Sequence, residues 1–168
     1  GEYLARLIEQ QDSAGGVVEC VADGVPAGIG EPVFDKVDAC LAKAIMSIGA
    51  VKGFEIGDGF AVAKMRGSEN NDPFRIAEDG SVEKTSNHSG GILGGMSDGS
   101  QIVLRAAFKP TPSISRQQNT VNRSGENTEI EIHGRHGPVI VPRAVVVVEC
   151  MTALTIADLL LQDRCAKL

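Results

Sequence analysis

Tryptophan is absent from the 168 residues, and aromatic side chains make up only 4% of them. Proteins that bind single-stranded nucleic acid stack the bases on aromatic side chains and hold the backbone with clustered basic residues. Here the lysines and arginines are dispersed along the chain, and the formal net charge is -6. The composition therefore argues against nucleic acid as a partner.

Other signals are missing as well. The four cysteines form no CxxC pair, and the three histidines lack the spacing of a zinc site, so no metal site is predicted. Cys20, Cys40 and Cys150 lie in apolar segments and are expected to be reduced thiols in the core of a cytoplasmic protein. No signal peptide is recognisable, and no run approaches the roughly 18 consecutive apolar residues of a membrane span. We expect no membrane partner.

What the chain does have is the composition of one globular domain, with 42% hydrophobic and 23% charged residues. Apolar residues at steps of three and four predict a helix that begins at Pro32 and stops at Gly49. Residues 144–161 are apolar on nearly all sides and predict a buried helix. A helix is also expected at 3–8, and strands at 17–22, 51–56, 102–109 and 128–133. This order predicts an α+β fold with an antiparallel sheet packed on helices.

The segment 67–87 is polar and shows neither a helical nor a strand period. Structureless loops longer than roughly 15 residues are uncommon in compact domains unless they cover a site or are disordered. We interpret the segment as a flexible loop, which is either a lid or a floppy insertion.

Two glycine pairs, at 90–91 and 94–95, flank two apolar residues shortly before the strand at 102–109. Such a backbone can adopt positive φ and lie flat against a planar ligand, although close backbone packing is an equal alternative. The strand leads into Lys109, Pro110, Thr111, Pro112 and Ser113. This stretch offers a cation and hydroxyls on a backbone stiffened by two prolines. Its alternative is a rigid exit from the strand.

A third candidate is the turn that holds Arg135 and His136. Arg135 offers a planar fork for phosphate or carboxylate, and His136 offers an acid, a base or a hydrogen-bond donor. A surface cap is the alternative. Functional residues concentrate on loops at strand ends, which favours a site.

Several of these motifs together resemble the chorismate synthase family. They lie at 26–36, 46–57, 66–68, 87–95, 109–114, 134–136 and 142–144. The resemblance covers nearly all of the chain but only the C-terminal half of the family's usual length. It therefore implies that 1–168 is a single-domain fragment, which agrees with a first helix that resembles the last turns of a longer one.

The resemblance implies a β-α-β sandwich, in which helices lie between two antiparallel sheets and this chain supplies one sheet with its helices. It also implies a lyase of the shikimate pathway of aromatic amino acid biosynthesis. The family removes phosphate from 5-enolpyruvylshikimate 3-phosphate by a 1,4-anti elimination, gives chorismate, and needs reduced FMN without net redox change. Its members are cytoplasmic and usually homotetramers.

Carried over by motif, the resemblance assigns flavin contacts to Gly49, Ala50, Gly94, Lys109, Pro110, Thr111, Pro112, Ser113 and Arg135. No catalytic residue is carried over. Gly137 occupies the position of the aspartate in the family's Arg-His-Asp-Pro motif, and Gly49 stands where many members have asparagine. The family's two catalytic histidines and most of its phosphate-binding arginines belong to the half that this sequence does not match.

Three interpretations stay open. The chain is half of an FMN and substrate site with little activity of its own, or an inactive fragment that provides only core and subunit contacts. The third is an unrelated nucleotide-binding α+β domain.

Overall fold

The computed structural model describes residues 1–134 and 137–166. Its centre is a three-stranded antiparallel sheet in the order β1-β7-β2, formed by β1 (Gly16–Ala22), β7 (Ile102–Phe108) and β2 (Val51–Ile56). β7 pairs with β1 along its whole length, and its pairing with β2 is interrupted by a bulge between Val51 and Gly53. These three strands confirm the predictions for 17–22, 51–56 and 102–109, the last of which ends one residue earlier than expected.

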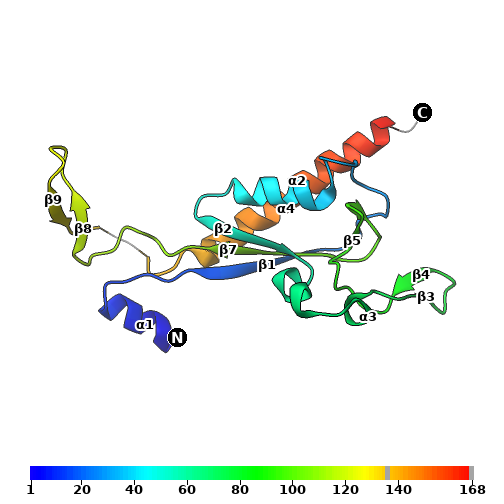
Figure 1. Ribbon diagram of the computed structural model, residues 1–168, viewed down its shortest axis with the longest axis horizontal. Helices are drawn as coiled ribbons and strands as arrows, with labels where there is room; N and C mark the ends of the chain where they lie inside the picture. The colour runs from blue at the N-terminus through cyan, green and yellow to red at the C-terminus, as the bar shows by residue number, and fades with distance from the viewer. Residues whose placement is uncertain (135–136, 167–168) are drawn as a thin grey trace.

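Two helices cover one face of this sheet (Figure 1): α2 (Val37–Met46) and α4 (Val141–Ala166). Residues of β7 alternate between buried and half-buried, because every second side chain points toward the helices. The expected α+β fold, with an antiparallel sheet packed on helices, is confirmed.

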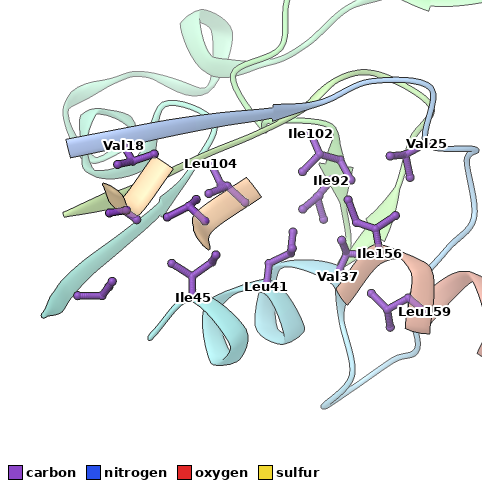
Figure 2. Packing of buried hydrophobic residues seen from close by; sticks show 14 of the residues in the cluster. Val18, Val25, Val37, Leu41, Ile45, Ile92, Ile102, Leu104, Ile156 and Leu159 are labelled. Carbon is purple, nitrogen blue, oxygen red and sulfur yellow. The ribbon is translucent and has the colours of Figure 1, made fainter. Parts of the chain in front are cut away.

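The core lies between the sheet and the two helices (Figure 2). Its largest fully buried side chains are those of Val37, Leu41, Ile45, Ile102, Leu104 and Val148. Each fully buried aliphatic side chain of this size contributes about 1.5–3 kcal/mol to folding. This layer fixes where both ends of β7 lie, and therefore where the loops at those ends begin.

α2 begins at Val37, so the prediction of a helix from Pro32 is wrong by more than one turn. The Glu31 backbone N–H donates to the Asp35 carbonyl, so the intervening residues form a turn that leaves the Phe34 side chain 87% exposed. The Val37 N–H is already bonded to the carbonyl of Gly95. The helix starts where the glycine cluster supplies this acceptor.

α4 is longer and less buried than predicted for 144–161. A single stripe faces the core, formed by Ala144, Val148, Thr152, Ile156 and Leu159. Other apolar side chains of the helix are exposed, namely Val145, Val146, Val147, Leu154 and Leu161. A helix lying on a sheet buries only one stripe, so its remaining apolar surface stays uncovered within the described residues.

α4 is also long and apolar enough to cross a membrane, with a mean hydropathy of 2.1 in its most apolar window. The expectation that no segment approaches this length overlooked it, because Glu149 and Asp158 interrupt the run. Core helices of soluble proteins pass the same test, so the property is weak evidence for a membrane.

The remaining elements are short. They are α1 (Glu2–Glu9), η1 (Gly59–Lys64), α3 (Gly67–Asn70), β3 (Phe74–Ile76), β4 (Val82–Lys84), β5 (Ile92–Leu93), β6 (Met96–Ser97), β8 (Gln118–Val121) and β9 (Asn127–Ile130). β9 pairs with β8 in a hairpin outside the main sheet, so the strand expected at 128–133 is shifted and ends earlier. The segment 67–87 contains α3 and the β3–β4 hairpin instead of a structureless loop. Its flexibility stays a prediction.

The cysteines are free thiols; Cys20 and Cys40 pack against the core, and the expected place in the core is wrong for Cys150. Cys20 and Cys40 are half-buried, while Cys150 is exposed on α4. Burial and the nearby Asp35 carboxylate raise the pKa of the Cys40 thiol.

Leu41→Ala tests the central layer. The Leu41 side chain is fully buried, so we expect the free energy of unfolding to fall by about 2–5 kcal/mol. Urea unfolding of the chain measures the change, and Leu154→Ala is the control because that side chain is 65% exposed. Equal losses for the two variants would contradict the described core.

Candidate functional site

The proline-rich stretch 109–113 leaves the sheet beside the turn that follows α2. The Lys109 N–H donates to the Ala50 carbonyl over 2.9 Å, and Ala50 has a left-handed φ of 70°. Gly49 is exposed, and a Cβ added there would meet no atom within 4 Å. The sheet register thus brings Gly49, Ala50 and Lys109 together, with open space on the glycine.

Lys109 is the cation of this group. Its side chain is exposed, and within residues 1–134 and 137–166 it takes part in no ion pair or side-chain hydrogen bond. The hydroxyl oxygen of Thr111 is buried and has no hydrogen-bond partner in the described part of the chain. An ammonium and a hydroxyl that both lack partners in this part of the chain, two residues apart in the sequence, suit an anionic, hydrogen-bonding ligand.

A small cavity of about 120 Å³ lies next to this stretch. Its walls include Asp12, Ser113, Gly134 and Gly137, and thus bring two of the sequence-predicted segments to one place. Arg135 and His136, predicted between these two glycines, lie outside the described residues.

Gly137 has room for a side chain. The closest atoms to a Cβ built there are the Arg143 guanidinium nitrogen and the Val139 carbonyl oxygen, both 3.8 Å away. These are ordinary van der Waals distances. A Cβ at this position fits without displacing the backbone and lies near the Arg143 guanidinium.

The second glycine pair forms the turn of the β5–β6 hairpin. Gly94 and Gly95 have φ of 60° and 88°, as the two central residues of a type I′ turn require. A Cβ on Gly94 would meet nothing within 4 Å, so its surface is open. Gly94 therefore presents bare backbone to the outside of the hairpin.

Gly94 does not lie beside Lys109. Gly95 contacts the beginning of α2, whereas Gly49 and Ala50 follow its end, and a ten-residue helix spans about 15 Å. Figure 1 shows β5 at the opposite end of the sheet from the chain that leads to β8. The structure thus divides the predicted flavin contacts between the two ends of the sheet.

The first glycine pair serves close packing, which confirms the alternative interpretation for these two positions. A Cβ on Gly90 would lie 2.4 Å from the Gly57 nitrogen, and one on Gly91 would lie 2.4 Å from the Gln101 carbonyl oxygen. At both positions the atoms nearest to the added Cβ belong to the backbone of another segment. No larger residue fits unless a strand end moves.

Sequence reasoning missed a buried charge network behind the glycine cluster. The Lys84 ammonium lies 2.7 Å from Asp98 Oδ2 and 3.4 Å from Asp72 Oδ2, and all three side chains are at most 8% exposed. Lys84 also donates to Asn87 Oδ1 and Ser89 Oγ. The network joins β4 to the loop that carries the glycines. Asp72 and Lys84 both belong to the polar segment 67–87. The sequence could not separate them from the exposed charges of that segment, because only their burial in the folded chain sets them apart.

The carboxylate of Asp72 is the centre of this network. Its oxygens accept hydrogen bonds from the Ser86 and Ser89 hydroxyls and from the His88 and Ser89 backbone N–H groups. Burial alone would raise the pKa of Asp72, but the hydrogen bonds lower it far below its ordinary range. The group is therefore a carboxylate throughout the neutral and mildly acidic range.

Sequence reasoning also missed a second cluster of charged side chains, on the central strand β7 and the turn after β2. The Arg105 guanidinium donates to the Gly57 carbonyl over 2.6 Å and lies 3.3 Å from Glu55. His88 Nδ1 lies 2.6 Å from Asp58 Oδ2. Arg105 thus attaches the turn after β2 to β7, and His88 attaches it to the loop before the glycine cluster.

Fold and site together define an α+β protein whose candidate ligand-binding groups lie on loops at strand ends. The family model described as Chorismate synthase matches residues 1–161. A chorismate synthase from Lachnoclostridium phytofermentans is 66% identical over 99% of this chain, and one from Methanosarcina barkeri is 60% identical over 96% of it. A crystal structure of chorismate synthase superposes with a TM-score of 0.78 at 35% identity over 96% of the chain. The chain belongs to the chorismate synthase family.

The matched relatives are considerably longer than this chain, which covers 46% and 44% of the two relatives above and 41% of the solved structure. The family name implies a lyase of the shikimate pathway.

The Asp72 network predicts acid sensitivity. The pKa of Asp72 is lowered on folding from 3.8, so its stabilising contribution is complete above pH 4 and is lost as the pH falls through the folded-state pKa. Urea unfolding at a series of pH values should show a fall in stability below about pH 4, and Asp72→Asn should make that fall shallower. Asp23→Asn is the control because its carboxylate is exposed and, among the residues that the structure describes, accepts a hydrogen bond from Gly24 only. An unchanged slope in Asp72→Asn would contradict the prediction.

Proposed function

We propose that this chain supplies part of the flavin and substrate site of a chorismate synthase, which eliminates phosphate from 5-enolpyruvylshikimate 3-phosphate with the help of reduced FMN. The proposal is carried by the Lys109 ammonium and the Thr111 hydroxyl, which have no side-chain partner among residues 1–134 and 137–166, together with the open Gly49–Ala50 turn. The names of the relatives support the same reaction.

These residues fit FMN. The Lys109 ammonium pairs with an anionic group, and the Thr111 hydroxyl gains the hydrogen bond that it lacks. The remaining contacts of this group are proposed to come from Pro110, Pro112, Ser113 and Arg135, whereas Gly94 lies at the other end of the sheet. Reduced FMN, when bound, supplies electron density to the breaking C–O bond. The chain's own groups bind and orient, and the rigid prolines hold them without reorganisation.

Proton transfer is where this chain departs from the family's pattern. Gly137 has no side chain, although the space around it accepts one. Without a carboxylate at this position, the chain is proposed to bind cofactor and substrate with reduced turnover. A positioned acid or base is typically worth about 10²- to 10⁴-fold in rate.

We further propose that the chain is part of a longer cytoplasmic enzyme, homotetrameric when complete. The uncovered apolar face of α4 supports this, because an exposed surface of this kind is normally buried by another part of the protein or by a partner. A non-catalytic fragment that supplies only core and subunit contacts is the second candidate, and the same apolar face favours it equally.

Titration with FMN separates the two candidates. In a full-length chorismate synthase that contains these 168 residues, flavin fluorescence should be quenched on binding. Lys109→Gln should raise the Kd by about tenfold or more, because a charge-assisted hydrogen bond is lost. Lys64→Gln is the control, since that lysine is exposed on η1. Unchanged fluorescence at high protein concentration would refute the proposed site.

Gly137→Asp tests the departure from the family's pattern. In the same full-length protein, chorismate formation from substrate and reduced FMN should rise by at least about tenfold, because a carboxylate is restored. Gly137→Asn is the matched control, with nearly the same shape and no acid–base function. Equal rates for Gly137 and Gly137→Asp would count against the proposed role.

A further inference from the structure

The segment Asp12, Ser13, Ala14 and Gly15, called the clasp below, contacts both halves of the candidate site. We propose that Asp12 and Ser13 are positioning residues, which set the distance between the stretch 109–113 and the stretch 137–138. The inference rests on the proposed function, since it concerns the geometry of the same FMN and substrate site. The clasp lies between α1 and β1.

The first set of contacts reaches the proline-rich stretch. The Ser13 hydroxyl donates to the Thr111 carbonyl over 2.7 Å. Gly15 lies against the same stretch, because a Cβ there would be 2.3 Å from the Phe108 carbonyl oxygen and 3.2 Å from the Pro110 ring. The absence of a side chain at Gly15 is therefore what lets the clasp approach the exit of β7.

The second set of contacts reaches the other segment. The Ala14 N–H donates to the Pro138 carbonyl over 2.8 Å, and Ala14 forms an isolated parallel bridge with Val139. Ala14 itself is buried, with 8% of its surface exposed. Neighbouring residues of the clasp thus hold two segments that are far apart in the sequence.

Asp12 fixes the clasp to its surroundings. One carboxylate oxygen accepts the Ser13 N–H over 2.8 Å, and the other lies 3.0 Å from the Arg116 guanidinium. The Asp12 N–H donates to the carbonyl of Leu7, at the end of α1. Arg116 follows the proline-rich stretch closely, so this ion pair secures that stretch at a second point beyond Thr111.

The position of Asp12 on the cavity wall gives it a direct influence on the site. Of the described residues that line the 120 Å³ cavity, Asp12 is the one with an ionisable side chain. Loss of its charge would release Arg116 and alter the electrostatic field between Ser113 and Gly137. A misplacement of about 1 Å can cost on the order of 10²-fold in an enzyme's rate.

The test uses the full-length protein described above, with FMN as the probe. Ser13→Ala and Asp12→Asn should each raise the Kd for FMN by about tenfold, with the midpoint of thermal unfolding lowered by no more than about 4 °C. Two rescues are expected, because Ser13→Thr keeps a hydroxyl and Asp12→Glu keeps a carboxylate. Ser124→Ala and Asp23→Asn are the matched exposed controls, expected to bind as the unmodified protein does.

A measurement without ligand completes the test. Amide hydrogen exchange of 111–115 should be faster in Ser13→Ala than in Ser124→Ala, because the hydrogen bond to Thr111 is gone. Unchanged FMN binding in both clasp variants, in a protein that does bind FMN, would overturn this inference and leave the proposed function standing. The inference would also be overturned if the variants bound FMN more weakly, no rescue restored binding, and the loss of binding followed a large loss of thermal stability. That result would show a merely structural role. Failure of the unmodified protein to bind FMN would overturn both.

Discussion

Burial of one face of a three-stranded sheet against two helices is the constraint on which the rest of the molecule depends. β7 lies in the middle, and its inward side chains are at most 5% exposed. Because that layer is closely packed, the two ends of β7 are fixed in space. The candidate site residues lie on loops at these ends. The apolar core thus acts on function by placing the points where those loops leave the sheet.

The loops are then held by polar contacts of two kinds. At one end, the buried Lys84, Asp72 and Asp98 side chains satisfy one another and fix the segment before the glycine hairpin. At the other end, the clasp is partly exposed and connects the proline-rich stretch to the segment around Gly137 through hydrogen bonds to backbone carbonyls. Breaking a buried network is costly because it leaves a buried charge without its partner. Changing a hydrogen bond of the partly exposed clasp costs less free energy and still alters the geometry of the site. The first is suited to stability and the second to the tuning of a site.

Sequence reasoning was most successful where a period was clear. The alternation from Ile102 to Phe108 and the β-branched run at Val17 gave strands with nearly correct bounds, and the motifs gave the family. It failed to place the start of α2, because that start depends on a hydrogen bond from the Val37 N–H to the carbonyl of Gly95, which is remote in the sequence. For α4 it predicted the helix but not its exposed faces, because composition cannot tell a helix buried on all sides from one that buries a single stripe.

For the candidate site, the sequence by itself determined the residue types: a lysine and hydroxyls between prolines, glycines in pairs, and a glycine at position 137. Only the tertiary structure decided which of them meet. It brought Lys109 to Ala50 and Ser113 to Gly137, and it placed Gly94 at the other end of the sheet. The physical reason is that local patterns fix backbone conformation over a few residues, while the distance between remote loops depends on how strands pair and which face is buried.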